Sequence, residues 1–358
     1  MASDSPPEPD RLDCAPHPAE TALIFGQDAV ARVLARAEAS GRLHHAWLLR
    51  GLEGVGKASF AYGFARRLLA EGRDPAPVAA RIRAGTEPGL RVLRRSVNES
   101  TGRLRQAIGI DEVRLLKGFL TLSLPDGGRR VVIVDPAEEL TQQAANALLK
   151  MLEEPPPRTV FLLVSQSPER LLPTIRSRCS TLSFHPLGME DLARALAQAG
   201  HPLDAAEAAR LTALSGGSVR QAIVLEQGDG LSRYAELVGL LAGGGLDRAG
   251  LAALAETVSG RGRETVYPLV CRLTLELLAR LARAGAIGPP EIEAAPDEAR
   301  LMAAGAACPA QGRLWAEAMV GAARGIRHAQ AVNLDPGQTI LDTYLALEKT
   351  LAAARRAV

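Results

Sequence analysis

The sequence predicts an α/β fold with a parallel sheet in the first half of the chain, followed by an all-helical second half. Short apolar runs, bounded by glycine or proline and too short for helices, are typical of buried parallel strands. These runs lie at 45–49, 130–135 and 159–165. Amphipathic helical patterns alternate with them, which favours a doubly wound sheet. These patterns lie at 28–39, 58–69, 111–122 and 142–154.

The segments between these elements carry the signals expected of connections and boundaries. Residues 72–89 are rich in Pro, Gly and Arg, so we expect a connection there. A second strand is expected at 91–95, a turn at 125–128 and a short strand at 179–184. Thr141 is expected to cap the helix that begins at the next residue.

Composition shifts along the chain predict three domains after a polar, Pro-rich lead. We expect the lead, at 1–20, to be disordered. An α/β domain is expected at 21–187, a small helical domain at 188–245 and a longer helical domain at 246–358. A run of glycines at 243–245 marks the last boundary.

Charge and cysteine content exclude several classes of protein. Basic residues number 42 and acidic residues 40, a net charge of +2, so the chain as a whole is no polycation that binds nucleic acid by charge alone. The four cysteines are widely spaced and form no C-x-x-C pair, so we expect neither a metal site nor a disulfide framework. The sequence carries no membrane-length apolar run and no signal-peptide core, so we expect a cytoplasmic protein.

The stretch GLEGVGKAS, which begins at Gly51, nearly matches a phosphate-binding loop. Gly51, Gly56 and Lys57 fit the pattern G-x-x-x-x-G-K-[ST], and Gly54 gives the backbone further freedom to turn its amides toward an anion. The loop follows a predicted strand and opens a predicted helix, as such a loop requires. Ala58 stands where a hydroxyl would hold magnesium. The pattern therefore predicts a phosphate loop without its metal ligand.

A second part of the hydrolytic machinery is also missing. Ser59 cannot replace the lost hydroxyl, because one residue along a helix turns the side chain by about 100°. Asp135 ends the strand VVIVD, where an acid orders the magnesium shell, and it is a candidate site residue. Pro136 follows at the place of the general base, and a proline accepts no proton. Glu138 and Glu139 come later and are expected to be exposed charges, so we expect no nucleotide turnover.

The stretch PTIRSRC places Arg176 and Arg178 on either side of Ser177, with Cys179 after them. Taken alone, this pattern is typical of a solvated helix end followed by a small buried cysteine. The preceding run NALLKMLEEPP favours a functional interpretation instead.

Three stretches, in this order, resemble the clamp-loader branch of the AAA+ proteins: the glycine loop, the run at 131–179, and GGSVRQAI at 216–223. The resemblance covers roughly residues 21 to 230. It implies an AAA+ phosphate-loop domain with a parallel sheet and flanking helices, then a small helical lid domain, then a C-terminal helical collar that joins subunits.

The resemblance also implies roles for particular residues. Ser177, Arg178 and Cys179 match the family's Ser-Arg-Cys motif, whose arginine reaches the ATP held by a neighbouring subunit. Arg178 is therefore the candidate arginine finger, acting in trans. Arg220 falls at the position of the sensor arginine of the lid domain.

What the resemblance implies about ligands and partners follows from the same matches. Ser165 or Ser167 would fall near the polar sensor at the end of a core strand. The loop keeps enough of an anion cradle for a residual ATP, ADP or bare phosphate, although no cofactor is certain. No cysteine lies between Cys14 and Cys179, so the four-cysteine zinc module of many relatives is missing or metal-free. Implied partners are the tau/gamma and delta subunits of the clamp loader, the sliding clamp, and primer-template DNA through the assembled complex.

Two other functions stay open at this point. One is an active AAA+ ATPase subunit of the tau/gamma type with an unusual magnesium site. The other is a DNA-binding scaffold that uses residues 81–130, where 11 basic residues outnumber 5 acidic ones, an excess of 6. A solvated arginine-rich surface explains that excess equally well.

Overall fold

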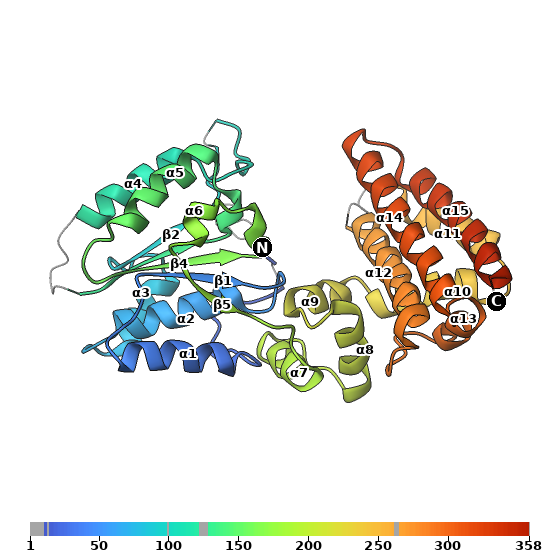
Figure 1. The fold of residues 1–358 in the computed structure, drawn as a ribbon, viewed down its shortest axis with the longest axis horizontal. Coiled ribbons are helices and arrows are strands. Elements are labelled where there is room, and N and C mark those ends of the chain that lie inside the picture. Colours follow the sequence, from blue (N-terminus) through green and yellow to red (C-terminus); the bar gives the residue numbers. More distant parts are fainter. Residues whose placement is uncertain (1–10, 13, 99, 122–127, 261–264, 358) are drawn as a thin grey trace. The chain divides into compact units, whose positions relative to one another are not determined.

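The computed structural model describes residues 11–12, 14–98, 100–121, 128–260 and 265–357 (Figure 1). The chain divides into two compact units. The first comprises Met1–Pro202 with Ser218–Arg220, and the second comprises Leu203–Gly217 with Gln221–Val358. The finer three-part division, with boundaries at 187 and 245, stays a prediction.

A five-stranded parallel sheet forms the centre of the first unit, in the order β2-β3-β4-β1-β5. Its strands are β1 Ala46–Arg50, β2 Leu90–Leu93, β3 Arg130–Val134, β4 Thr159–Ser165 and β5 Ser180–Ser183. Every residue of β4 is buried, because both faces of a parallel sheet are covered. The run TVFLLVS was predicted as a strand for that reason, and the prediction is confirmed.

Helices cover both faces of this sheet. The elements are α1 Asp28–Ala39, α2 Lys57–Leu69, α3 Pro75–Arg83, α4 Ile110–Thr121, η1 Ala137–Glu139, α5 Gln142–Glu153, η2 Pro168–Arg170, α6 Pro173–Arg176 and α7 Met189–Gln198. Figure 1 shows α1, α2 and α3 on one face of the sheet and α4, α5 and α6 on the other. On the second face, side chains of α4 and α5 such as Leu116 and Leu148 share one core with Val132 and Phe161 of the strands.

Helix α3 lies within 72–89, so the prediction of a connection there is wrong over these residues. Asp74 caps the helix by accepting a hydrogen bond from the Ala76 amide at 3.0 Å, and Pro75 occupies the first helical position. A proline is tolerated there because its missing N–H would have no helical partner. Val78 and Ile82, one turn apart, are buried.

The predicted disordered lead differs from the structure between residues 14 and 20. This segment turns twice, with hydrogen bonds from Ala15 N to Leu12 O and from Glu20 N to His17 O. Ala19 is buried, and the His17 ring meets Tyr62 of α2 edge-on. Residues 1–10 and 13, and most of the turn predicted at 125–128, lie outside the described residues.

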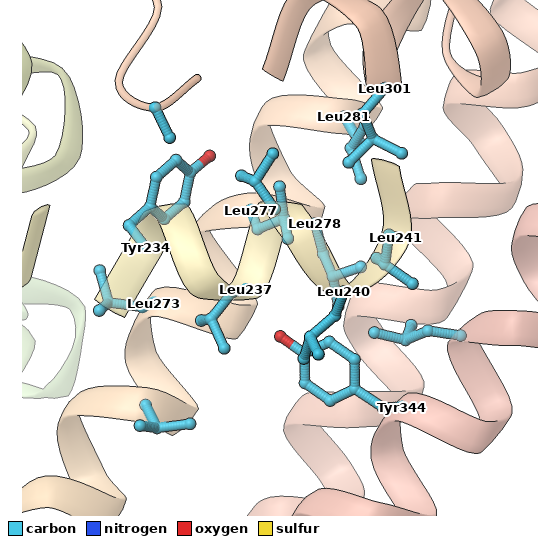
Figure 2. Packing of buried hydrophobic residues seen from close by; sticks show 14 of the residues in the cluster. Tyr234, Leu237, Leu240, Leu241, Leu273, Leu277, Leu278, Leu281, Leu301 and Tyr344 are labelled. Carbon is cyan, nitrogen blue, oxygen red and sulfur yellow. The ribbon is translucent and has the colours of Figure 1, made fainter. Parts of the chain in front are cut away.

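All the regular secondary structure among the described residues of the second unit is helical, which together with the parallel sheet confirms the predicted fold class. Its helices are α8 Ala205–Ser215, α9 Val219–Gln227, α10 Gly230–Ala242, α11 Arg248–Val258, α12 Val266–Ile287, α13 Glu298–Gly305, α14 Pro309–Ala331 and α15 Pro336–Arg356. The first two residues of α9 belong to the first unit. Leucines of α10 and α12 pack into one core, with Tyr234 and Tyr344 among them (Figure 2). No helix among the described residues combines the length and the apolar character that crossing a membrane requires.

A fully paired polar group lies inside this leucine core. Glu298 is 0% exposed, and each of its carboxylate oxygens accepts two hydrogen bonds. Arg280 donates to both oxygens at 2.6 and 3.0 Å, the Tyr234 hydroxyl donates at 2.6 Å and the Ala294 amide at 2.7 Å. Burial, and next the charge of Glu298, raise the pKa of Tyr234, so its hydroxyl stays protonated and remains a donor. Four groups from separate parts of the unit are thereby held at one point.

Substitution Arg280→Met should lower the free energy of unfolding of the second unit by about 3–5 kcal/mol, because it leaves the buried Glu298 charge without its counter-ion. Urea unfolding measures this loss. Arg283→Met is the control variant. The Arg283 side chain is 59% exposed, so this substitution should lower the free energy of unfolding by no more than about 1 kcal/mol. Equal losses in the two variants would contradict the assignment.

Helices α12 and α14 cross where two glycines meet. A Cβ added to Gly285 would lie 2.5 Å from the backbone of Gly312, and one added to Gly312 would lie 2.8 Å from the Ala282 carbonyl oxygen. Real Cβ atoms do not approach backbone so closely, so the crossing requires glycine on both helices.

Substitution Gly312→Ala should therefore destabilise the second unit by about 1–3 kcal/mol through overpacking. Gly321, on the same helix, provides the control, because a Cβ there would meet nothing within 4 Å. Gly321→Ala should raise stability by about 0.4–1 kcal/mol through the lower entropy of the unfolded chain. Thermal unfolding of both variants should give midpoint shifts of opposite sign.

Candidate functional site

The glycine loop lies between β1 and α2. Gly54 and Gly56 have φ angles of +75° and +94°, which favour glycine. Position 51 requires glycine for another reason: a Cβ there would lie 2.6 Å from the Phe184 carbonyl oxygen. Helix α2 begins at Lys57, directly after the loop, so the amides of its first turn face the loop. The local geometry is that of an anion cradle.

Lys57 closes onto the loop that it follows. Its ammonium donates to the carbonyl oxygens of Gly51 at 2.8 Å and Leu52 at 2.6 Å, and the residue is 6% exposed. Burial lowers the pKa of Lys57, while the acidic residues Asp135, Glu138 and Glu53 act in the opposite direction. Carbonyl oxygens and carboxylates of this chain thus stabilise the charge of Lys57.

Asp135 lies close enough to Lys57 for its charge to raise the pKa of the lysine. Ser59, in contrast, is engaged elsewhere, with its hydroxyl 3.1 Å from that of Thr21. It therefore supplies no substitute for the hydroxyl that Ala58 lacks. The residues present fit an anion held by amides and a lysine, and the loop offers no hydroxyl to a magnesium ion.

Glu138 is not the exposed charge that the sequence predicted. It is half-buried, and its Oε1 accepts hydrogen bonds from the amides of Gln166 at 2.8 Å and Ser167 at 3.1 Å. It therefore ties the chain after β3 to the end of β4. Its Oε2 atom and the hydroxyl of the fully buried Ser165 have no hydrogen-bond partner among the described residues. Glu139 is half-buried as well and pairs with Arg95 at 2.8 Å.

The segment Ser218–Arg220 packs directly on the glycine loop. The Ser218 hydroxyl donates to the Glu53 carbonyl oxygen at 2.8 Å, and the Val219 amide donates to Gly54 O at 3.0 Å. Arg220 forms an ion pair with the Glu53 carboxylate at 3.0 Å. A Cβ on Gly54 would lie 2.4 Å from both Ser218 Oγ and Arg220 Cβ. Gly54 is therefore needed for this contact, which sequence spacing alone could not indicate.

Arg178 lies just after α6, at the surface of the first unit. Its guanidinium donates to the Glu153 carboxylate at 2.7 Å and to the Thr174 carbonyl oxygen at 3.0 Å. Ser177 also donates to Thr174 O, at 3.0 Å. Cys179 is inert by comparison, because burial raises the pKa of its thiol to about 12. Of the three motif residues, Ser177 is exposed, and Arg178 and Cys179 are half-buried.

The parallel register puts Arg178 and the glycine loop at opposite edges of the sheet. Strand β5 pairs with β1, with Ser180 beside Trp47 and Ser183 beside Arg50. Arg178 comes before β5 and so lies at the amino edge, whereas the loop follows β1 at the carboxyl edge. The four residues of β5 alone span roughly 13 Å at about 3.3 Å each. The chain's own loop therefore lies a strand length away from its candidate arginine finger.

Part of the basic charge counted at 81–130 is paired with acidic side chains nearby. Four of these arginines form ion pairs with acidic residues, namely Arg81, Arg95, Arg114 and Arg129. Arg103 and Arg105 are exposed in a tight hairpin closed by the bridge between Val97 and Leu104. Two of the acidic partners, Glu139 and Glu71, lie outside 81–130, so they lower the uncompensated excess of the segment from 6 to 4.

The first unit is similar to known proteins of bacterial DNA replication. Residues 26–188 match the family model described as "DNA polymerase III, delta subunit". The DNA polymerase III subunit delta' of Pseudomonas aeruginosa is 43% identical over 186 residues, which cover 49% of this chain and 53% of the relative. The first unit resembles a delta-prime subunit. The delta' subunit of Escherichia coli is 37% identical over 198 residues, 53% of this chain and 57% of that one.

The delta-prime resemblance extends to related subunits but not to whole chains. The gamma/tau subunit of Mycobacterium tuberculosis is 34% identical over 220 residues, 59% of this chain and 37% of the relative. This chain thus spans about half the length of the delta' relatives and less of the gamma/tau subunit. A gamma-subunit-related protein of Thermotoga maritima aligns over 92% of this chain and 98% of its own, at 21% identity and a TM-score of 0.34.

Substitution Gly54→Ala should release the segment Ser218–Arg220 from the loop, because the added Cβ occupies the space of Ser218 and Arg220. Hydrogen exchange at the Val219 amide should accelerate by about three- to tenfold as its bond to Gly54 O is lost. Gly56→Ala is the matched control: it carries a similar φ penalty, but its Cβ would meet only Ile24, at 3.8 Å. The contact is refuted if both variants leave Val219 equally protected.

Proposed function

We propose that this chain is a delta-prime-like subunit of the bacterial DNA polymerase III clamp loader, and that it supplies Arg178 to the ATP of a neighbouring subunit without hydrolysing ATP itself. In this proposal it helps load the sliding clamp onto primed DNA in the cytoplasm. Its partners are the tau/gamma and delta subunits, the clamp, and primer-template DNA through the assembled complex. The family match over 26–188 and the delta' relatives support this role.

The observation that carries the proposal is the separation of Arg178 from the chain's own glycine loop. An arginine at the amino edge of the sheet cannot serve an anion bound at the carboxyl edge of the same sheet. It can serve one that a neighbour presents. Its pair with Glu153 is suited to such exchange, because the two side chains are 37% and 42% exposed. Ion pairs this exposed contribute only about 0–1 kcal/mol, whereas an arginine–phosphate contact is bidentate and stronger.

The state of the loop supports the second half of the proposal. Ala58 provides no magnesium ligand, and Pro136 occupies the place of the general base. The Lys57 ammonium is already bonded to two loop carbonyls. In our proposal Arg220, paired with Glu53, takes the sensor position of a site that has lost its chemistry. The glycines retain a cradle for a residual ATP, ADP or phosphate, which plays no part in turnover.

Substitution Arg178→Ala should abolish the increase in ATP turnover that this chain gives to its partner subunits, and should reduce clamp loading. An arginine finger contributes on the order of 10³- to 10⁵-fold at the site that it completes. The measurement is steady-state ATP hydrolysis by the complex purified through a tag on this chain, with clamp and primed DNA present. Arg176→Ala is the control, because Arg176 is exposed and adjacent.

Assembly of the complex should be unchanged in both variants. Full stimulation by the Arg178→Ala chain would reject the arginine-finger role. Brisk ATP hydrolysis by the isolated chain would favour an active tau/gamma-type subunit instead, and tight, steeply salt-dependent DNA binding by the isolated chain would favour the scaffold.

A further inference from the structure

Glu153 is the last residue of α5, and its carboxylate contacts the guanidinium of Arg178. The guanidinium is held on two sides, since one terminal nitrogen donates to Glu153 and the other to the Thr174 carbonyl oxygen. Arginine has five N–H donors in a planar fork. Two contacts fix the plane of that fork and leave the remaining donors available.

Glu153 lies at the C-terminal end of a helix, which is an unfavourable position for an acidic side chain. The last turn of a helix carries a partial negative charge, and an acidic residue there costs about 0.3–1 kcal/mol unless a cation compensates. Arg178 is such a cation, and it comes from a different element 25 positions along the chain. The neighbouring Glu154 is exposed and carries no ion pair in the part of the chain described, so charge at this helix end does not by itself produce the contact.

The end of α5 is itself anchored. His45, the residue before β1, donates from Nε2 to the carbonyl oxygen of Leu152 at 3.0 Å. A carbonyl can only accept, so this nitrogen carries the proton. The His45 ring stacks on that of His44, with centroids 4.4 Å apart. The backbone next to Glu153 is thereby tied to the residue that precedes β1, an inner strand of the sheet.

We propose that Glu153 is a positioning residue for Arg178: it sets the orientation of the guanidinium before the triphosphate of a neighbouring subunit arrives. This inference rests on the proposed function. A flexible arginine side chain loses conformational entropy when it binds a phosphate. An arginine that is already oriented loses less entropy and therefore binds more favourably. The half-exposed pair orients the side chain without trapping it, since its strength is small next to a phosphate contact.

The test uses the complex purified through a tag on this chain, and it measures the increment in ATP turnover that the chain adds to its partners. Substitution Glu153→Ala should lower the kcat of that increment by about three- to tenfold, with little change in KM, because orientation acts on the transition state. Glu153→Gln keeps a hydrogen-bond acceptor and should retain more than half of the increment. Glu154→Ala should match the unsubstituted chain.

The double variant Glu153→Ala, Arg178→Ala should be no lower than Arg178→Ala alone, since the glutamate acts through the arginine. Two outcomes overturn the inference: an increment unchanged or raised in Glu153→Ala, or further loss in the double variant. If Arg178→Ala itself has no effect, the proposed function fails, and that result is distinct from a normal Arg178 effect with an inert Glu153.

Discussion

The parallel register of β1 with its neighbours β4 and β5 is the constraint on which the rest of the first unit depends. Parallel strands must be joined by crossovers, so the segments that follow strands gather at one edge of the sheet and those that precede strands gather at the other. The glycine loop is of the first kind and Arg178 of the second. Because β1 pairs with a strand on each side, shifting its pairing by one residue would move both segments against the helices that hold them.

Four backbone carbonyls of the glycine loop accept hydrogen bonds from within the chain. Two of its carbonyls accept from Lys57, two more accept from Ser218 and Val219, and Glu53 is paired with Arg220. These contacts hold the loop in the backbone shape of an anion site. Two requirements therefore account for its glycines. One is that backbone shape, and the other is the close approach of neighbouring residues at Gly51 and Gly54.

Elements whose signals are local could be predicted from the sequence. Helix α1 and strand β4 have the bounds that their patterns predicted, and Thr141 caps α5 as expected, accepting from the Ala144 amide. Helix α3 was missed because its proline lies at a position that permits proline, so composition indicated a connection. The contacts that define the candidate site could not be predicted, because residues such as Glu53 and Arg220 meet only after the chain has folded. Motif resemblance indicated which residues to examine, but not that Glu153 would hold Arg178.

The glycine crossing of α12 and α14 has a consequence beyond local stability. Backbone touches backbone there, so no side chain lies between the two helices to repack when a neighbour changes. Elsewhere in the leucine core, one aliphatic residue can replace another at moderate cost. Among chains that share this helical unit, tolerance of substitution should thus be lowest at two positions that carry no side chain at all.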